Sequence, residues 1–128
     1  MKKDITNRSD IQLLVDSFYE KVKKDQLIGY LFTDVARVNW AHHLPRMYDF
    51  WENVIFQTGS FSGNPMIAHT RLHQQSPLTK EHFDQWINLF TQTVDEHFEG
   101  EKAAVTKQRA ISIARVMQYK IVQSSGIY

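Results

Sequence analysis

Apolar residues along the chain recur at intervals of three and four, the spacing that lines one face of an α-helix. The first such stripe begins at Ile11 and is followed by the charged run Lys23-Lys24-Asp25. Ser9, just ahead of the stripe, is a residue type that caps helix N-termini. We therefore expect a first helix that starts at Ser9 and ends in the charged run. Its buried face would be formed by Ile11, Leu14, Val15, Phe18, Tyr19 and Val22.

The second long helix has two candidate starts because its sequence contains Pro45. Proline is tolerated in a first helical turn, where its missing N–H leaves no bond unmade, so one start lies near Pro45. The other lies at Asp34, and Pro45 would then mark a kink or a join. With either start, His43 projects along the apolar stripe formed by Met47, Phe50, Trp51 and Val54. A loop rich in Gly, Ser and Pro follows, from Thr58 to Pro65.

Three more helical segments are predicted after this loop. A short one, Met66 to His73, ends before Pro77. Thr79 can cap a long helix that Gly100 ends. The last helix runs from about Glu101 to Ser125, and Gly126 suits its C-terminal cap. Its apolar face contains Ala103, Ala110, Ile113, Ala114, Met117 and Ile121. No segment alternates with a period of two over the length of a strand, so the predicted fold class is all-α.

Composition narrows the possible functions. A chain of 128 residues can bury a sizeable core as one domain. Its 15 Lys and Arg nearly balance 14 Asp and Glu, and no like-charged block predicts a nucleic-acid or membrane partner. The lack of cysteine excludes disulfides, thiolate zinc sites, iron–sulfur clusters and Cys-ligated haem. With no apolar run of the roughly 18 residues that span a bilayer, we expect a cytoplasmic protein.

Six histidines include two close pairs, His42–His43 and His69–His73. His69 and His73 have the spacing of the zinc motif H-E-x-x-H, but Thr70 replaces its catalytic glutamate, which argues against a metalloprotease. A non-hydrolytic zinc site would need further ligands, which no spacing nominates. A short helix is marginal alone, so either packing or a histidine bond to a metal or haem iron must anchor this segment. Solvent exposure or a capping hydrogen bond is the simpler expectation for His42, His73, His82 and His97.

Five motifs follow one another in order. They are Phe18-Tyr19; Leu31-Phe32; Trp40 and His43 ahead of Phe50-Trp51; Gly59-Ser60-Phe61-Ser62-Gly63-Asn64-Pro65 followed by His69; and His82-Phe83-Asp84-Gln85-Trp86-Ile87-Asn88-Leu89-Phe90. Together they resemble the group III truncated haemoglobins, from about Ile11 to Tyr119. The resemblance implies a shortened globin fold, a two-over-two helical sandwich around a haem. Residues 1–128 would form a single domain, with residues 1–9 as a polar extension.

The resemblance also implies roles for individual residues. His69 would be the proximal iron ligand, and His73 would replace it only if the short helix shifted. Tyr19, Trp86 and His43 would face the bound ligand. Because Pro45 follows His43 closely, His43 could gate entry, swing out to solvent or bind iron. The cofactor would also be held by Phe32, Met47, Phe50 and Trp51, with Arg46, Arg71 and Arg37 as candidates for its propionates.

These roles predict a haem b (protoporphyrin IX iron) protein that reversibly binds O2, NO or CO. Dioxygen gains negative charge on ferrous iron, so Tyr O–H and Trp N–H donors would stabilise it. Detoxification of NO or reactive oxygen, with an unidentified reductase as partner, would be compatible with this site. Two alternatives stay open at this point. One is a haem peroxidase-like enzyme, and the other is a non-haem helical bundle with a His-rich metal site.

Overall fold

The computed structural model describes residues 1–59, 61, 63 and 65–124, and for residues 122–124 the backbone alone. The helices are α1 (Arg8–Lys24), α2 (Trp40–Phe56), α3 (Pro65–Gln75), α4 (Lys80–His97) and α5 (Glu101–Ser124), with a π-helical turn, η1 (Leu31–Val35), between α1 and α2. Within the described part of the chain, β-type pairing is limited to an isolated bridge between Lys3 and Phe98. None of the described helices is long and apolar enough to cross a membrane.

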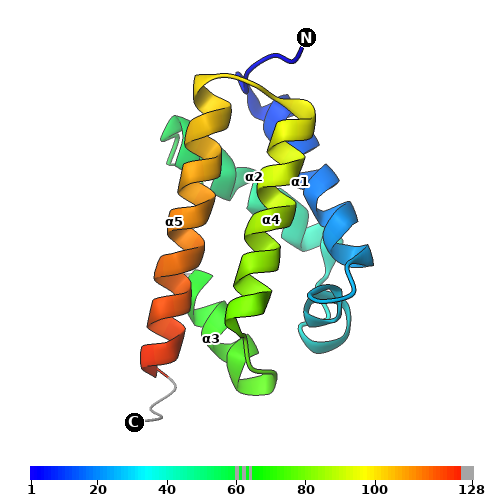
Figure 1. The fold of residues 1–128 in the computed structure, drawn as a ribbon, viewed down its shortest axis with the longest axis vertical. Helices are drawn as coiled ribbons and strands as arrows, with labels where there is room; N and C mark the ends of the chain where they lie inside the picture. Colours follow the sequence, from blue (N-terminus) through cyan, green and yellow to red (C-terminus); the bar gives the residue numbers. More distant parts are fainter. Residues whose placement is uncertain (60, 62, 64, 125–128) are drawn as a thin grey trace.

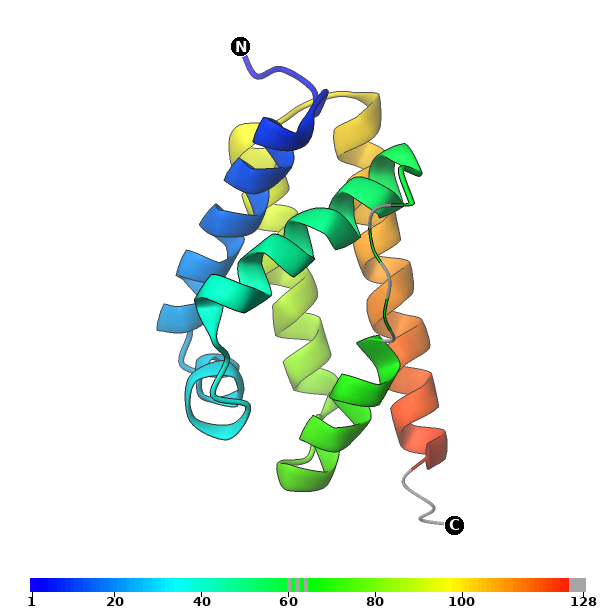
Figure 2. The same cartoon turned by 180° about the vertical axis from the view of Figure 1, so that it is seen from behind.

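Two antiparallel helix pairs are stacked on each other (Figures 1 and 2). α1 and α2 form one layer, and α4 and α5 form the other. α1 packs on α4, and α2 crosses α5. The short α3 lies beside the C-terminal part of α5 and also contacts η1 (Figure 2). The prediction of an all-α, two-over-two truncated globin fold is confirmed.

The first helix has the predicted buried face but a different start. All six apolar residues of the predicted stripe are buried. The N-cap is Asn7, whose side-chain oxygen accepts a 3.0 Å hydrogen bond from the Asp10 N–H, so the prediction of Ser9 as the cap was wrong. Asn7 has an extended backbone, which lets its side chain reach back over the first turn, whereas Ser9 already lies inside the helix.

Residues ahead of α1, predicted only as a polar extension, contribute to the core and to a helix cap. Ile5 is buried in the core. The Asp4 carboxylate accepts hydrogen bonds from the N–H groups of Lys102 (2.9 Å) and Ala103 (2.8 Å), at the start of α5. Gly100 makes this approach feasible, because a Cβ at that position would lie 2.6 Å from the Asp4 Cγ. The segment therefore ties the N-terminus to the turn between α4 and α5.

The second helix begins at Trp40, so both starts considered from the sequence were wrong. The Asn39 carbonyl accepts hydrogen bonds from the N–H groups of His42 (3.1 Å) and His43 (2.8 Å), which sets the first turn ahead of Pro45. Asp34 lies in η1 instead. Pro45 sits inside α2 and has no N–H to offer the Ala41 carbonyl one turn before it.

Histidine side chains help to end α3 and to begin α4. The Leu78 N–H donates to His73 Nδ1 (2.9 Å). Thr79 caps α4 as predicted: its hydroxyl accepts from the His82 N–H (3.3 Å), and its own N–H donates to His82 Nδ1 (3.1 Å). Of the two simpler expectations for His73 and His82, exposure or a capping hydrogen bond, the capping hydrogen bond is the one that the structure shows. The predicted cap Gly126 lies outside the described residues.

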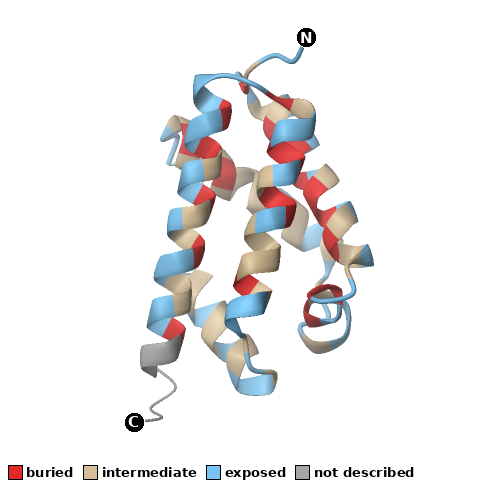
Figure 3. Ribbon diagram, viewed as in Figure 1, coloured by how far each residue is buried: buried red, intermediate tan, exposed pale blue. Residues whose placement is uncertain are grey.

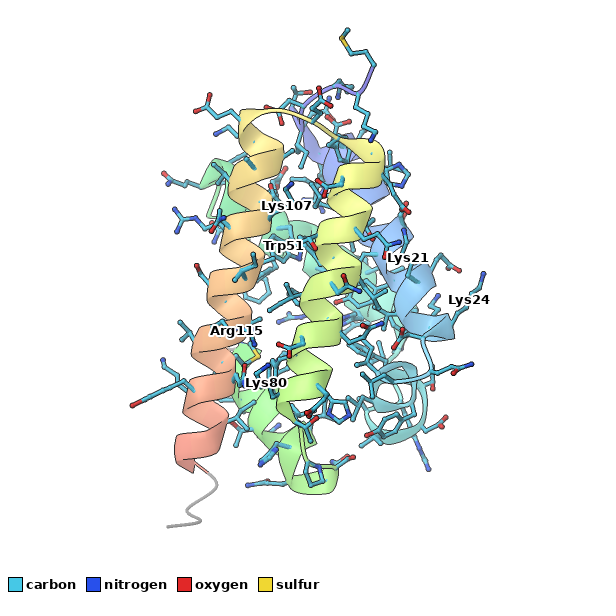
Figure 4. The ribbon with its side chains drawn as sticks, in the orientation of Figure 1. Lys21, Lys24, Trp51, Lys80, Lys107 and Arg115 are labelled. Atoms are coloured by element: carbon cyan, nitrogen blue, oxygen red, sulfur yellow. The ribbon has the colours of Figure 1, made fainter. Side chains whose placement is uncertain are left out.

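Burial is uneven along the sandwich. Buried residues recur along α1, α4 and α5, whereas α3 contains none (Figure 3). Trp51, labelled in Figure 4 behind α4 and α5, stacks on Phe90 at 4.6 Å between ring centroids. On the surface, Lys107 pairs with Asp95 (2.6 Å), which links α5 to α4. The core thus fills one half of the sandwich, and the half beside α3 encloses a cavity.

Candidate functional site

A cavity of about 350 Å³ lies between the two layers, beside α3. Nine of the predicted site residues line it, namely Tyr19, Phe32, His43, Arg46, Met47, Phe50, Trp51, His69 and Trp86. Arg71 does not line it and is exposed on α3. Most of the lining is aromatic or aliphatic. A flat apolar cofactor with a few polar contacts suits such a surface.

Tyr19 and His43 form a pair on one side of this cavity. His43 Nε2 lies 3.3 Å from the Tyr19 hydroxyl, within hydrogen-bond distance. α1 supplies Tyr19 from the C-terminal half of its buried stripe, and the first turn of α2 supplies His43. His43 therefore lies inside the helix and at the cavity. The pair brings a hydroxyl and an imidazole to one apolar wall.

Burial sets the protonation of both partners. It lowers the pKa of His43 from its ordinary 6.5 to about 4, and the positive charge of protonated His69, of Arg46 and of protonated His42 acts in the same direction. Burial also raises the pKa of Tyr19. At neutral pH the cavity thus presents a neutral imidazole and a protonated hydroxyl. Either group can donate a hydrogen bond to a ligand.

Trp86 enters the cavity from α4 at the end of an aromatic stack. Its ring lies parallel to Phe90, with 5.3 Å between centroids and 9° between planes. Phe90 stacks in turn on Trp51, which also lines the cavity. Because both neighbours are fixed in the core, the indole of Trp86 is held in one orientation. Its N–H is a donor only.

His69 lies on α3 and lines the cavity in a neutral form. Its Nδ1 donates to the Pro65 carbonyl at 2.6 Å, which leaves Nε2 as an acceptor. Burial lowers the pKa of His69, although the bond to Pro65 acts in the opposite direction. An imidazole whose Nδ1–H is bonded to a backbone carbonyl is the usual form of a metal-ligating histidine. His73, by contrast, uses its Nδ1 as a helix cap and does not line the cavity.

Only one of the three candidate propionate-binding arginines is placed at the cavity. The Arg46 guanidinium lies 5.4 Å from the Phe61 ring centre, beside the cavity. Arg37 is exposed, with a backbone φ of 51°, and its Nε donates to the Asp34 carbonyl at 3.5 Å. Arg71 faces solvent on α3. Position in the sequence alone did not distinguish these three side chains.

Several cavity residues were not assigned to the site from the sequence. They are mainly Phe61, Leu78, His82, Ile113, Ala114 and Met117. Ile113, Ala114 and Met117 belong to the apolar stripe predicted for the last helix, so the signal was present. A stripe of this kind does not indicate whether its residues fill a core or face a cavity.

The cavity fits a haem on the evidence of its own residues. It combines apolar walls with the neutral imidazole of His69, whose Nε2 is an acceptor. Tyr19 and Trp86 contribute hydrogen-bond donors, and Arg46 contributes a cation. Among the described residues, no group of three or more His, Asp or Glu side chains could hold a metal ion. His69, with its Nδ1–H bonded to Pro65 and its Nε2 an acceptor at the cavity, has the form that suits an axial ligand of a haem iron.

The fold and this cavity define a globin, and comparisons with known proteins agree. The family model described as bacterial-like globin matches residues 3–121. The group 3 truncated hemoglobin ctb of Campylobacter jejuni is 30% identical over 129 residues, which cover 98% of this chain and 99% of that protein. A crystal structure of group III truncated hemoglobin from Campylobacter jejuni superposes with a TM-score of 0.82 at 29% identity, covering 94% of this chain and 95% of that one.

The chain belongs to the bacterial-like globin family, and within that family to the group III truncated haemoglobins. It is thus a haem protein that binds diatomic ligands.

Titration of His43 predicts how the stability of the haem-free chain depends on pH. In the unfolded chain His43 takes up a proton near pH 6.5, whereas in the folded chain it does so only near pH 4. The unfolded state therefore binds more protons between these values, and the free energy of unfolding falls as the pH falls through this window. Because His43 is only half-buried, we expect its share to be at most roughly 2–3 kcal/mol. Denaturant unfolding at a series of pH values measures it.

His43→Gln supplies the control for this measurement. His69 and His82 also have lowered pKa values, so the variant should keep part of the pH dependence and lose the His43 share. An unfolding free energy that falls as steeply in His43→Gln as in the wild type would contradict the neutral, buried state of His43.

Proposed function

We propose that this protein reversibly binds dioxygen at a haem b held by His69, with Tyr19 and Trp86 as the hydrogen-bond donors to the ligand. One observation carries the proposal: the same apolar cavity contains a neutral imidazole with a free Nε2 and, from other helices, a buried hydroxyl and an indole. When bound, the haem iron would supply the site at which a diatomic ligand coordinates.

The Tyr19 hydroxyl is well suited to recognise a polarised ligand. A buried hydroxyl without a partner costs about 1–3 kcal/mol, and Tyr19 meets this need through His43. If neutral His43 donates its Nε2–H to the phenolic oxygen, the Tyr19 proton is free to point into the cavity. His43 would then orient Tyr19, and Tyr19 would donate to the ligand together with Trp86.

Reversible oxygen binding is tested by absorption spectroscopy on the reduced, haem-loaded protein. Addition of oxygen should change the spectrum, and its removal under inert gas should restore the reduced spectrum over several cycles. Immediate and complete oxidation at the first addition, with no reversible phase, would overturn the proposal. NO and CO should bind the same reduced protein, and their spectra serve as references for an intact pocket.

A peroxidase-like activity is the second candidate, and the neutral state of His43 favours it. An unprotonated imidazole in the cavity can accept a proton from hydrogen peroxide, which assists cleavage of its O–O bond. Turnover of a reducing dye, compared between the wild type, His43→Gln and free haemin, measures this activity. A wild-type rate no higher than that of free haemin would exclude this second function.

A further inference from the structure

We propose that Trp40 is a positioning residue that holds the first turn of α2, and with it His43, at the cavity. Trp40 does not line the cavity, so it would act through His43 and would not touch the ligand. The proposal rests on the proposed function in one respect, namely that His43 orients Tyr19 towards the bound ligand. The position of His43 itself is tested separately below.

The first turn of α2 makes one backbone hydrogen bond fewer to the rest of its helix than a regular turn, because Pro45 follows it. Asn39, the residue before it, makes no side-chain capping hydrogen bond. Pro45 has no N–H, so the Ala41 carbonyl lacks its usual partner within the helix. The turn that contains His43 is thus held by the Asn39 carbonyl, which accepts from the His42 and His43 N–H groups, but it has no side-chain cap at its start and lacks one backbone hydrogen bond at its end. Side-chain contacts therefore help to fix this turn.

Trp40 supplies that fixation through its ring contacts. It lies three residues before His43, on the same face of α2, and the two rings are 5.8 Å apart in an edge-to-face arrangement. Its ring is also 5.3 Å from Tyr19 and 6.3 Å from Phe32, on which it stacks. Trp40 therefore joins the turn to both α1 and η1, in addition to the direct contact of His43 with Tyr19.

α1 holds the indole of Trp40 from a second position. The Lys23 ammonium lies 4.6 Å from the centre of the Trp40 ring, a cation–π contact. Lys23 follows Tyr19 by one helical turn, so both contacts come from the same face of α1. The indole thus contacts both Tyr19 and Lys23 of α1, a helix whose own apolar face is buried. Loss of the indole would free the turn and expose His43 to water.

The pKa of His43 reports whether its side chain is buried at the cavity or exposed to water. Burial is the main cause of its lowered pKa, and the positive charges of Arg46 and of protonated His69 and His42 add to it. Lys23 lies beyond Trp40, and Tyr19 contacts the His43 ring without carrying charge at neutral pH. Hydration of His43 would raise its pKa towards 6.5 while the rest of the chain stays folded.

The test is an NMR titration of the histidine rings in the carbon monoxide complex of the reduced protein. The His43 signal is assigned by its absence in His43→Gln. In Trp40→Ala we expect the His43 midpoint to rise by about one pH unit or more, and in Trp40→Phe to stay near the wild-type value. Phe56→Ala is the matched control, because Phe56 is a half-buried aromatic at the other end of α2 with Lys102 over its ring, and it should leave the midpoint unchanged.

An unchanged His43 midpoint in folded Trp40→Ala would overturn the proposal. If that variant does not fold, Trp40→Leu, which keeps apolar volume without the ring contacts, should show a smaller rise, and no rise there would overturn it equally. As a second readout, the carbon monoxide association rate of Trp40→Ala should match that of His43→Leu, and the double variant should add no further change. A failure of the donor role of Tyr19 would leave the titration result intact, so the two proposals can fail separately.

Discussion

Tyr19→Phe is expected to speed the release of dioxygen roughly ten- to a hundredfold. A hydrogen bond to a charged group contributes about 1.5–3 kcal/mol, and each 1.4 kcal/mol corresponds to about a factor of ten. The substitution removes the hydroxyl and leaves the ring contacts of Tyr19 with Phe18, Phe32 and Trp40. Stopped-flow replacement of dioxygen by carbon monoxide measures the release rate.

Two comparisons isolate the hydrogen bond from packing. Carbon monoxide carries little negative charge, so its release should change far less in the same variant. Tyr48→Phe is the matched control, because the Tyr48 hydroxyl donates to Asp16 outside the cavity, and its dioxygen release should equal that of the wild type. Trp86→Phe should act in the same direction as Tyr19→Phe, and the double variant should be non-additive if both donors share one ligand. An unchanged rate in Tyr19→Phe would make Tyr19 a packing residue only.

His69→Ala is expected to lose haem binding or weaken it strongly. α3 has no buried residue, and His69 is its neutral imidazole at the cavity, so an axial bond from His69 would fix both the cofactor and the helix. The haem content of the purified variant, read from its absorption relative to protein, measures the loss.

His73→Ala and His42→Ala are the controls for this substitution, and both should retain haem. His73 lies one turn from His69 and serves as a cap for the α3–α4 turn, so its loss perturbs the same segment without removing the ligand. Loss of haem from His73→Ala, with retention in His69→Ala, would mean that the ligand was assigned one helical turn too early.

The sequence predicted the helices well because burial alone determines their faces. The stripe from Ile11 to Val22 has a helical period and is buried throughout. The starts of the helices depend on which of several nearby residues serves as the N-cap. Asn7 and Ser9 are both good caps, and the choice of Asn7 depends on its extended backbone and on Asp10. At Pro45 the packing of a whole turn outweighs the cost of a missing hydrogen bond, which no local rule indicates.

The sequence predicted the cavity residues correctly where a motif fixes their position. It did not do so where only the exposure of a side chain separates one candidate from another. His69 follows the loop proline at a fixed distance, and Tyr19 lies on a buried stripe, so the sequence predicts both at the site, and both line the cavity. Arg46 and Arg71 are indistinguishable by type, yet only Arg46 reaches the cavity. The α5 residues were recognised as apolar but not as cavity lining, because that distinction depends on how far α3 stands from α5.

The haem pocket is tested most directly by an absorption titration of haem into the haem-free chain. The wild type should develop a Soret band distinct from that of free haemin and should saturate at one haem per chain. In His69→Gly the band should be weak and should recover when free imidazole is added, because imidazole can replace the missing ligand in the space left by the side chain. A wild-type spectrum that stays identical to free haemin, or a His69→Gly titration that matches the wild type without imidazole, would contradict a His69-ligated haem.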